Sequence, residues 1–131
     1  MIVFLGSIVI GDGNLIEEQV TIINTHPGRV LVIGHCNVFE IGAHVEAISI
    51  DSNNVFEAKT FIGPNVVVTD GCVVGAICRL TGKEKLTENI VIYGEKCSRR
   101  IAFEKTAPQI LQLDFLAIIL PNYHHMKVKS K

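Results

Sequence analysis

Apolar residues recur at every sixth position over most of this chain. An apolar lead residue is often followed by Gly, Glu or Asp, and a small or amide residue often stands four places after the lead. Twelve lead positions are all apolar and fall into four sets of three: Ile10, Ile16 and Ile22; Ile33, Phe39 and Val45; Ile50, Phe56 and Ile62; Val68, Val74 and Leu80. This pattern predicts short strands joined by turns, each directing one side chain into a common core.

A longer repeat contains the period of six. The phrase Asn-apolar-apolar-Glu occurs at Asn14–Glu17, Asn37–Glu40 and Asn54–Glu57, so 23 residues separate the first two copies and 17 the last two. Repeats of about twenty residues indicate structural units stacked one on the next. Three blocks of six per coil predict a three-sided solenoid of about four coils, with Ile16, Phe39, Phe56 and Val74 stacked inside it.

These blocks resemble the hexapeptide-repeat family. The resemblance implies an all-β solenoid, a left-handed parallel β-helix, although the usual crossover rule favours the right hand. Two segments interrupt the pattern: a turn-rich excursion at Asn24–Arg29 and a charged loop at Lys83–Asn89. Ile90–Gly94 is then expected to be the last strand, with Glu95–Arg100 leading away from it. The β-helix is therefore predicted over 1–94, and a connector, helix and basic tail over 95–131.

The period becomes helical from Thr106. Pro108 suits the first turn of a helix, and Pro121 ends it. Two apolar stripes follow: Ile110, Leu113, Leu116 and Leu120 in one, and Leu111, Phe115, Ile118 and Ile119 in the other. A helix lying on the solenoid needs one stripe. The second stripe predicts either contact with a partner, through Phe115, Leu111 and Ile118, or burial of both stripes under the end of the coils.

Composition limits the classes of function. The chain has 131 residues, of which 48% are hydrophobic and 19% charged, and its net charge is −1, which fits one folded domain. No stripe of Arg and Lys with interleaved aromatic residues occurs, which argues against a nucleic-acid partner. No apolar run reaches the roughly 18 residues of a membrane span. Cys72 and Cys78 take inward positions of the repeat, so free thiols and a cytoplasmic location are favoured over disulfides.

Hexapeptide-repeat proteins include acyltransferases and zinc carbonic anhydrases, so catalysis has to be weighed. A zinc enzyme needs three convergent histidines. His35 and His44 are expected at outward turns of one coil and His26 in the excursion, which does not supply such a set. An acyltransferase needs a general base, and His26 is the sole candidate. We therefore predict no catalytic residue, no metal and no cofactor, with a carbonic anhydrase-like or acyltransferase enzyme as the alternative.

The repeated phrase predicts two columns of polar residues. Glu17, Glu40 and Glu57 each follow a stacked lead residue, and carboxylates about 5 Å apart repel by about 1 kcal/mol even in water. They either splay into solvent or receive the arginines of a partner. Asn14, Asn37 and Asn54 form the matching inward column, where amides can hydrogen-bond from coil to coil.

The whole chain from about Ile8 onward resembles the dynactin subunit 6 family. The resemblance rests on Ile8–Gln19, Asn37–Glu40, Val91–Gly94 with Arg99-Arg100, Leu111–Leu116 and Ile119–His125. It implies a non-catalytic subunit of the dynactin pointed-end complex, cytoplasmic and cytoskeletal, that supports dynein-dependent transport along microtubules and cargo selection. The implied partners are dynactin subunit 5, the pointed-end actin-related protein and its companion. Family members have roughly two more coils before the segment matching Ile8, so we expect an exposed coil edge at Met1–Ile8 that promotes association.

Overall fold

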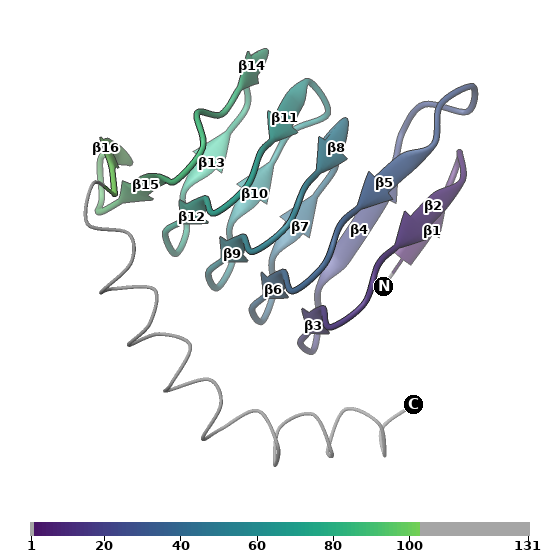
Figure 1. Ribbon diagram of the computed structural model, residues 1–131, viewed down its shortest axis with the longest axis horizontal. Helices are drawn as coiled ribbons and strands as arrows, with labels where there is room; N and C mark the ends of the chain where they lie inside the picture. The colour runs from purple at the N-terminus through teal and green to yellow at the C-terminus, as the bar shows by residue number, and fades with distance from the viewer. Residues whose placement is uncertain (1, 103–131) are drawn as a thin grey trace. The chain divides into compact units, whose positions relative to one another are not determined.

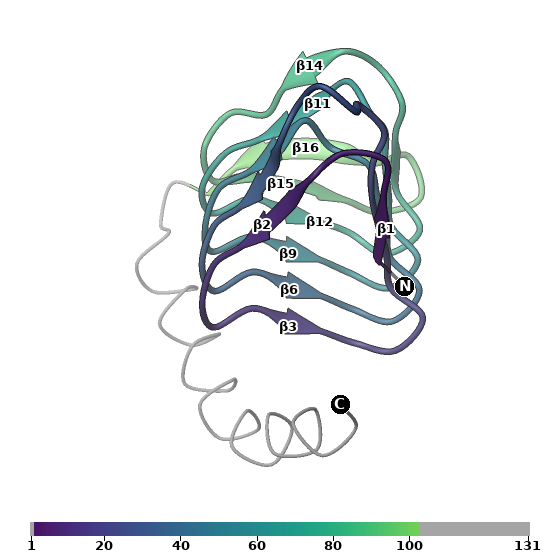
Figure 2. The ribbon, with the colours of Figure 1, turned by 90° about the vertical axis from the view of Figure 1, so that its right-hand side faces the viewer.

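The computed structural model describes residues 2–102, which fold as a stack of short β-strands around one core. From β1 to β15, successive strands lie on successive faces of the stack, so strands three apart in the chain are neighbours in the same sheet (Figure 1). Figure 2, which looks along the stack, shows three faces with coils lying one above another. Within the described residues every strand pair is parallel except β15 with β16. This is the architecture of a β-helix solenoid.

Three sheets form the faces. Sheet A contains β1 (Ile2–Phe4), β4 (Thr21–Asn24), β7 (His44–Val45), β10 (Phe61–Ile62) and β13 (Arg79–Leu80). Sheet B contains β2 (Ile8–Ile10), β5 (Leu31–Ile33), β8 (Ser49–Ile50), β11 (Val66–Val68) and β14 (Glu84–Lys85). Sheet C contains β3 (Leu15–Ile16), β6 (Val38–Phe39), β9 (Val55–Phe56), β12 (Val73–Val74), β15 (Ile90–Tyr93) and β16 (Ser98–Ile101). Four complete coils, β2 to β13, agree with the predicted number.

The lead residues of the sixfold pattern form the core. Phe39 and Phe56 are fully buried and stack with ring centroids 4.9 Å apart, because β6 and β9 place them in register. The first coil departs from the prediction: Ile10 is 36% exposed and Ile16 is only partly buried. Both lie in strands at the edge of their sheets, β2 and β3, where the described residues place no coil over them.

Residues in the left-handed backbone conformation, with positive φ, bend the chain at two corners of each coil. They stand between sheets B and C at Gly13, Cys36, Asn53, Gly71 and Asn89, and between sheets C and A at Gln19, Gly42, Lys59 and Ile77. Gly and Asn adopt positive φ at little cost, whereas a β-branched residue does not. Ile77, with φ 67° and 71% exposed, is therefore the strained corner of the coil.

The charged segment Lys83–Asn89 was expected to be a loop, and this prediction is wrong. Its residues Glu84 and Lys85 form β14, which pairs with β11 and continues sheet B. Leu86 is 1% exposed and belongs to the core. The sixfold register in fact continues from Leu80 to Leu86 and Ile92, and the charged side chains surround a lead residue of an additional coil.

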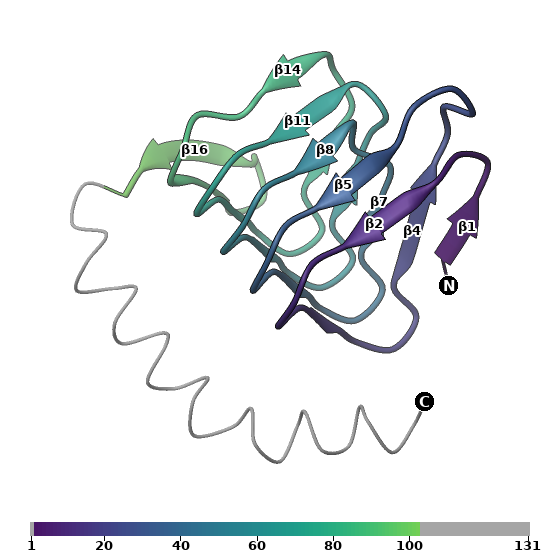
Figure 3. The ribbon, with the colours of Figure 1, turned by 45° about the vertical axis from the view of Figure 1, so that its right-hand side comes forward.

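The segment Glu95–Arg100 does not lead away from the last strand, as the sequence analysis predicted. The chain turns at Gly94 and returns as β16, antiparallel to β15, with Val91 opposite Arg100 and Tyr93 opposite Ser98. Figure 3 shows this hairpin at one end of the solenoid and β1 with β2 at the other. Sheet C is therefore one strand longer than the other two sheets within the described residues.

The excursion after β4 has the expected irregular conformation over residues 25–30. Asn24, at the start of the excursion, is 3% exposed. Its Nδ2 donates to Ser7 O at 2.8 Å and to Arg29 O at 2.6 Å, and these bonds hold the start of the excursion in place. Cys36, Cys72, Cys78 and Cys97 are all free thiols, in agreement with the prediction. The helix predicted from Thr106 to Leu120 lies outside the described residues.

Candidate interaction surfaces

Glu17, Glu40 and Glu57 form the predicted column, at the corner where sheet C ends and the chain turns toward sheet A. Their carboxylates do not simply splay into solvent. Glu17 Oε1 accepts a hydrogen bond from Ile41 N at 3.1 Å, and Glu57 Oε1 accepts one from Ala76 N at 3.1 Å. Glu40 accepts the backbone N–H of Ala58. Each carboxylate therefore binds the turn of the following coil, through a charge-assisted hydrogen bond.

The three carboxylates also repel one another. Partial burial raises the pKa of Glu40, the negative charges of Glu57 and Glu17 raise it further, and the hydrogen bond from Ala58 opposes the rise. The column ends at Gly75, which stands where the next glutamate would be. A Cβ on Gly75 would lie 2.8 Å from Ile92 O, so the close approach of β15 requires glycine there.

The asparagine column is confirmed as a structural ladder. Asn14 Oδ1 accepts from Asn37 N at 2.8 Å, and Asn37 Oδ1 accepts from Asn54 N at 2.9 Å and from Asn54 Nδ2 at 3.0 Å. Asn54 Oδ1 accepts from Cys72 N at 2.7 Å. Asn37 and Asn54 are fully buried, so these bonds satisfy the polar groups of the corner between sheets B and C.

The outward face of sheet C is an apolar column. Its members are paired in register along five parallel strands: Leu15, Val38, Val55, Val73 and Val91. They alternate with the inward residues of the same strands and lie outside the main core cluster, although Leu15 and Val55 are only 7% and 9% exposed. A continuous apolar column on an outer sheet face is typical of a surface that packs against another element.

The outward face of sheet A carries a stack that the sequence analysis missed. The His44 and Phe61 rings stack with centroids 5.1 Å apart, and the Arg79 guanidinium lies 4.4 Å from the Phe61 centroid. His44 Nε2 also pairs with Glu46 Oε2 at 2.6 Å. His44 lies on β7 and not at a turn as predicted. The signal for this stack was the position immediately before each lead residue, which holds His44, Phe61 and Arg79 in successive coils.

The other histidines within residues 2–102 are His26 and His35. His35 Nδ1 accepts from Asp12 N at 2.8 Å, which joins two neighbouring coils. His26 lies in the excursion, where its Nε2 has no hydrogen-bond partner among the residues that the structure describes. Over residues 2–102 no three His, Cys, Asp or Glu side chains gather in a group that could hold a metal ion. In the same part of the chain no helix has the length and hydropathy needed to span a membrane.

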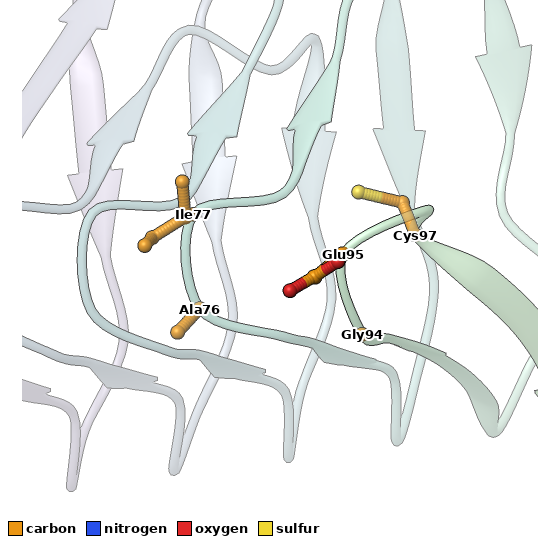
Figure 4. A pocket seen from close by; sticks show the side chains of 5 residues that line it. All are labelled: Ala76, Ile77, Gly94, Glu95 and Cys97. Carbon is orange, nitrogen blue, oxygen red and sulfur yellow. The ribbon is translucent and has the colours of Figure 1, made fainter.

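A small pocket lies beside the β15–β16 hairpin. It has a volume of about 270 Å³ and is lined by Ala76, Ile77, Gly94, Glu95 and Cys97. Figure 4 shows Cys97 and Glu95 on the hairpin side and Ala76 with Ile77 on the turn of the preceding coil. The pocket therefore lies between the turn that joins β12 to β13 and the turn of the β15–β16 hairpin.

Comparisons with known proteins place the chain in a family. No model of a protein family matches the sequence. A protein of Nematostella vectensis named dynactin subunit 6 is 52% identical over 136 aligned positions, which cover 96% of this chain and 74% of that protein. The chain belongs to the dynactin subunit 6 family. Proteins of that name from Xenopus tropicalis and Danio rerio are 48% and 49% identical, with 68% and 70% of their lengths covered.

Similarity to the dynactin subunit 6 family extends over nearly the whole chain, and so includes the solenoid. Of the predicted contact residues, the structure brings together Glu17, Glu40 and Glu57. Phe115, Leu111 and Ile118 lie outside the described residues. Two further surfaces, the apolar column of sheet C and the stack on sheet A, come from the structure alone.

Proposed function

We propose that the chain is a non-catalytic subunit of the dynactin complex. The proposal rests on one observation, the similarity of 96% of the chain to proteins named dynactin subunit 6. As in the sequence-based expectation, we place it in the cytoplasm and at the cytoskeleton, with a role in dynein-dependent transport along microtubules and in cargo selection. The left-handed sense of the solenoid, expected for hexapeptide repeats, is part of the same proposal.

The side chains that an enzyme would use support a structural role. The carboxylates of Glu17 and Glu57 hold backbone N–H groups of the following coil, and His35 holds the N–H of Asp12. His44 is occupied by its hydrogen bond with Glu46 and its stack on Phe61. These groups join coil to coil, and the described residues around them converge on no common point where a substrate would react.

We further propose that dynactin subunit 5 is the direct partner, with the pointed-end actin-related protein and its companion nearby. The glutamate column offers one contact. Hydrogen bonds within the column use Oε1 of Glu17 and Oε1 of Glu57, which leaves Oε2 of each to accept from an arginine of the partner. Arginine binds carboxylates through a planar fork of N–H groups, and a column of carboxylates provides several such contacts.

We also propose that the predicted C-terminal helix packs along the solenoid. Its first stripe, from Ile110 to Leu120, would span about 15 Å as a helix. Three coil spacings of about 4.8 Å give nearly the same length. The second stripe, with Phe115, Leu111 and Ile118, would then remain available to hold the partner.

Co-purification tests the proposal. The full chain is tagged, recovered from cytosol, and the accompanying proteins are identified by mass spectrometry. We expect dynactin subunits, with dynactin subunit 5 in near-equal amount. Glu57→Gln keeps an oxygen that can accept from Ala76 N but removes the charge, so it should weaken recovery of the partner while the melting temperature is unchanged. A folded chain that recovers no dynactin subunit would contradict the proposal.

A further inference from the structure

Two cysteines meet at the pocket beside the β15–β16 hairpin. Cys97 lies in the hairpin turn, and Cys78 lies immediately before β13, on the coil next to it. Both use the same acceptor, because Gly94 O accepts from Cys97 N at 3.0 Å and from Cys78 Sγ at 3.7 Å. The Cys97 thiol is also near enough to Cys78 to raise the pKa of the Cys78 thiol. Figure 4 shows the Cys97 sulfur directed back over Glu95, toward the side of the pocket formed by the preceding coil.

The two thiols differ in their access to solvent. Cys97 is partly exposed and lines the pocket, whereas Cys78 is 1% exposed. Burial raises the pKa of Cys78 to about 11, and the neighbouring Cys97 thiol adds to this rise. A dissolved oxidant therefore reaches Cys97 first. A partly exposed cysteine beside a second, protected thiol has the arrangement of a redox-sensing pair.

We propose that Cys97 and Cys78 are a peroxide-responsive pair that closes to a disulfide. The Cys97 thiolate attacks hydrogen peroxide, the O–O bond breaks, and the leaving hydroxide takes the proton that the Cys97 thiol has lost, so the products are a Cys97 sulfenic acid and one water molecule. The Cys78 thiolate then attacks the Cys97 sulfur, the S–O bond breaks, and the leaving hydroxide takes the proton that Cys78 has lost to give the second water. Two thiols are oxidised and one peroxide is reduced, so no other reactant is required.

The disulfide would tie the hairpin turn to the coil beside it. Within the described residues β16 is held by its ladder with β15 and by the side chain of Arg99. A covalent bond at Cys97 would prevent β16 from separating from the solenoid. This regulation goes beyond the proposed subunit role and does not depend on it.

The test is peptide mapping of the full 131-residue chain after brief treatment with hydrogen peroxide. Trypsin releases residues 60–79 and 97–99, and the expected product is these two peptides joined by a disulfide. Because Cys72 lies in the same peptide as Cys78, fragment ions must place the bond on Cys78. Cys36→Ser serves as a control, since Cys36 is exposed but distant in the fold, and this variant should form the disulfide normally.

Single variants separate the two steps. Cys97→Ser should lose the cross-link, and Cys78→Ser should accumulate Cys97 sulfenic acid that a dimedone probe captures. If Cys78→Ser does not fold, the wild-type map and Cys97→Ser still decide the question. The proposal is overturned if peroxide converts Cys97 of the wild-type chain to sulfinic acid without a cross-link, if the bond joins Cys72 or Cys36 instead, or if all four thiols remain reduced.

Discussion

Arg99 on the returning strand β16 forms a two-pronged ion pair with Glu84 on β14. The Nη1–Oε2 distance is 2.6 Å and the Nη2–Oε1 distance is 2.7 Å. The pair connects the last strand of sheet B to the last strand of sheet C, and so closes the end of the solenoid across a corner. Arg99 holds the pKa of Glu84 below its ordinary value through these hydrogen bonds.

The ion pair predicts a pH-dependent effect of Arg99→Gln. At pH 7 the free energy of unfolding should fall by up to about 1 kcal/mol, because the pair is bidentate but partly exposed. Since the folded-state pKa of Glu84 is depressed, its contribution is present above the ordinary glutamate pKa of 4.5 and is lost as the pH falls through the folded-state value. Urea titrations at pH 7 and near pH 3 measure both effects.

Arg100→Gln is the matched control for that experiment. Arg100 lies 5.9 Å from the Tyr93 ring centroid and makes no carboxylate contact that the structure describes. Its replacement should lower stability equally at both pH values. An Arg99→Gln effect that is the same at pH 7 and pH 3 would show that the ion pair does not contribute.

The asparagine ladder predicts a large cost for Asn37→Ala. Asn37 is fully buried, and its Oδ1 satisfies two donors of Asn54 while its Nδ2 donates to Asp51 O at 2.8 Å. Leaving these groups unpaired should lower the free energy of unfolding by about 1–3 kcal/mol. Asn65→Ala, at an exposed position, should change it by less than about 0.5 kcal/mol. Equal effects of the two variants in thermal unfolding would exclude the ladder as a source of stability.

The strained corner at Ile77 predicts a stabilising substitution. Its φ of 67° is unfavourable for a β-branched residue, and its 71% exposure means that little packing is lost with the side chain. Asn tolerates this conformation, so Ile77→Asn should raise the free energy of unfolding by about 1 kcal/mol. Ile41→Asn is the control, because Ile41 is also exposed but does not have a positive φ. A lower melting temperature for Ile77→Asn alone would mean that the side chain makes contacts worth more than the strain.

Much of the solenoid could be predicted from sequence because its core positions repeat strictly. Phe39, Phe56 and Val74 occupy the predicted core, and the amides of Asn37 and Asn54 stack as the spacing required. The prediction that Ile10 is buried was wrong. A lead residue is buried only where neighbouring coils cover it, and this depends on its position in the stack. The β14 strand was missed because charged side chains surround Leu86, although the sixfold register continues through it.

The surface features were harder to predict. Arg99 pairs with Glu84 only because β16 reverses direction, and the sequence analysis had no signal for an antiparallel return after Tyr93. The stack of His44, Phe61 and Arg79 depends on which residues of adjacent coils are in register. The repeat carries this register in the position before each lead residue. The spacing of the repeat predicted the glutamate column. The hydrogen bonds from these carboxylates to backbone N–H groups could not be predicted, because they depend on the geometry of the turns.

The proposed C-terminal helix predicts different outcomes for two changes at Phe115. If Phe115 contacts the partner, Phe115→Ala and Phe115→Glu should leave the melting temperature of the isolated chain unchanged and should abolish recovery of dynactin subunit 5, since aromatic anchors dominate such interfaces. Lys129→Glu, in the basic tail, is the control and should retain the partner. Normal recovery with Phe115→Glu would remove this residue from the interface, and unfolding of both variants would place it in the core.

Sedimentation of a cell extract through a density gradient tests the central claim most directly. The chain has a mass of 14.4 kDa, so a free monomer stays near the top of the gradient, far from a large assembly. If the chain is a dynactin subunit, it should sediment in the same fractions as dynactin subunit 5 and the other dynactin subunits, and depletion of any of these with an antibody should remove it. A folded chain found only in the monomer fractions, in an extract whose dynactin is intact, would contradict the account.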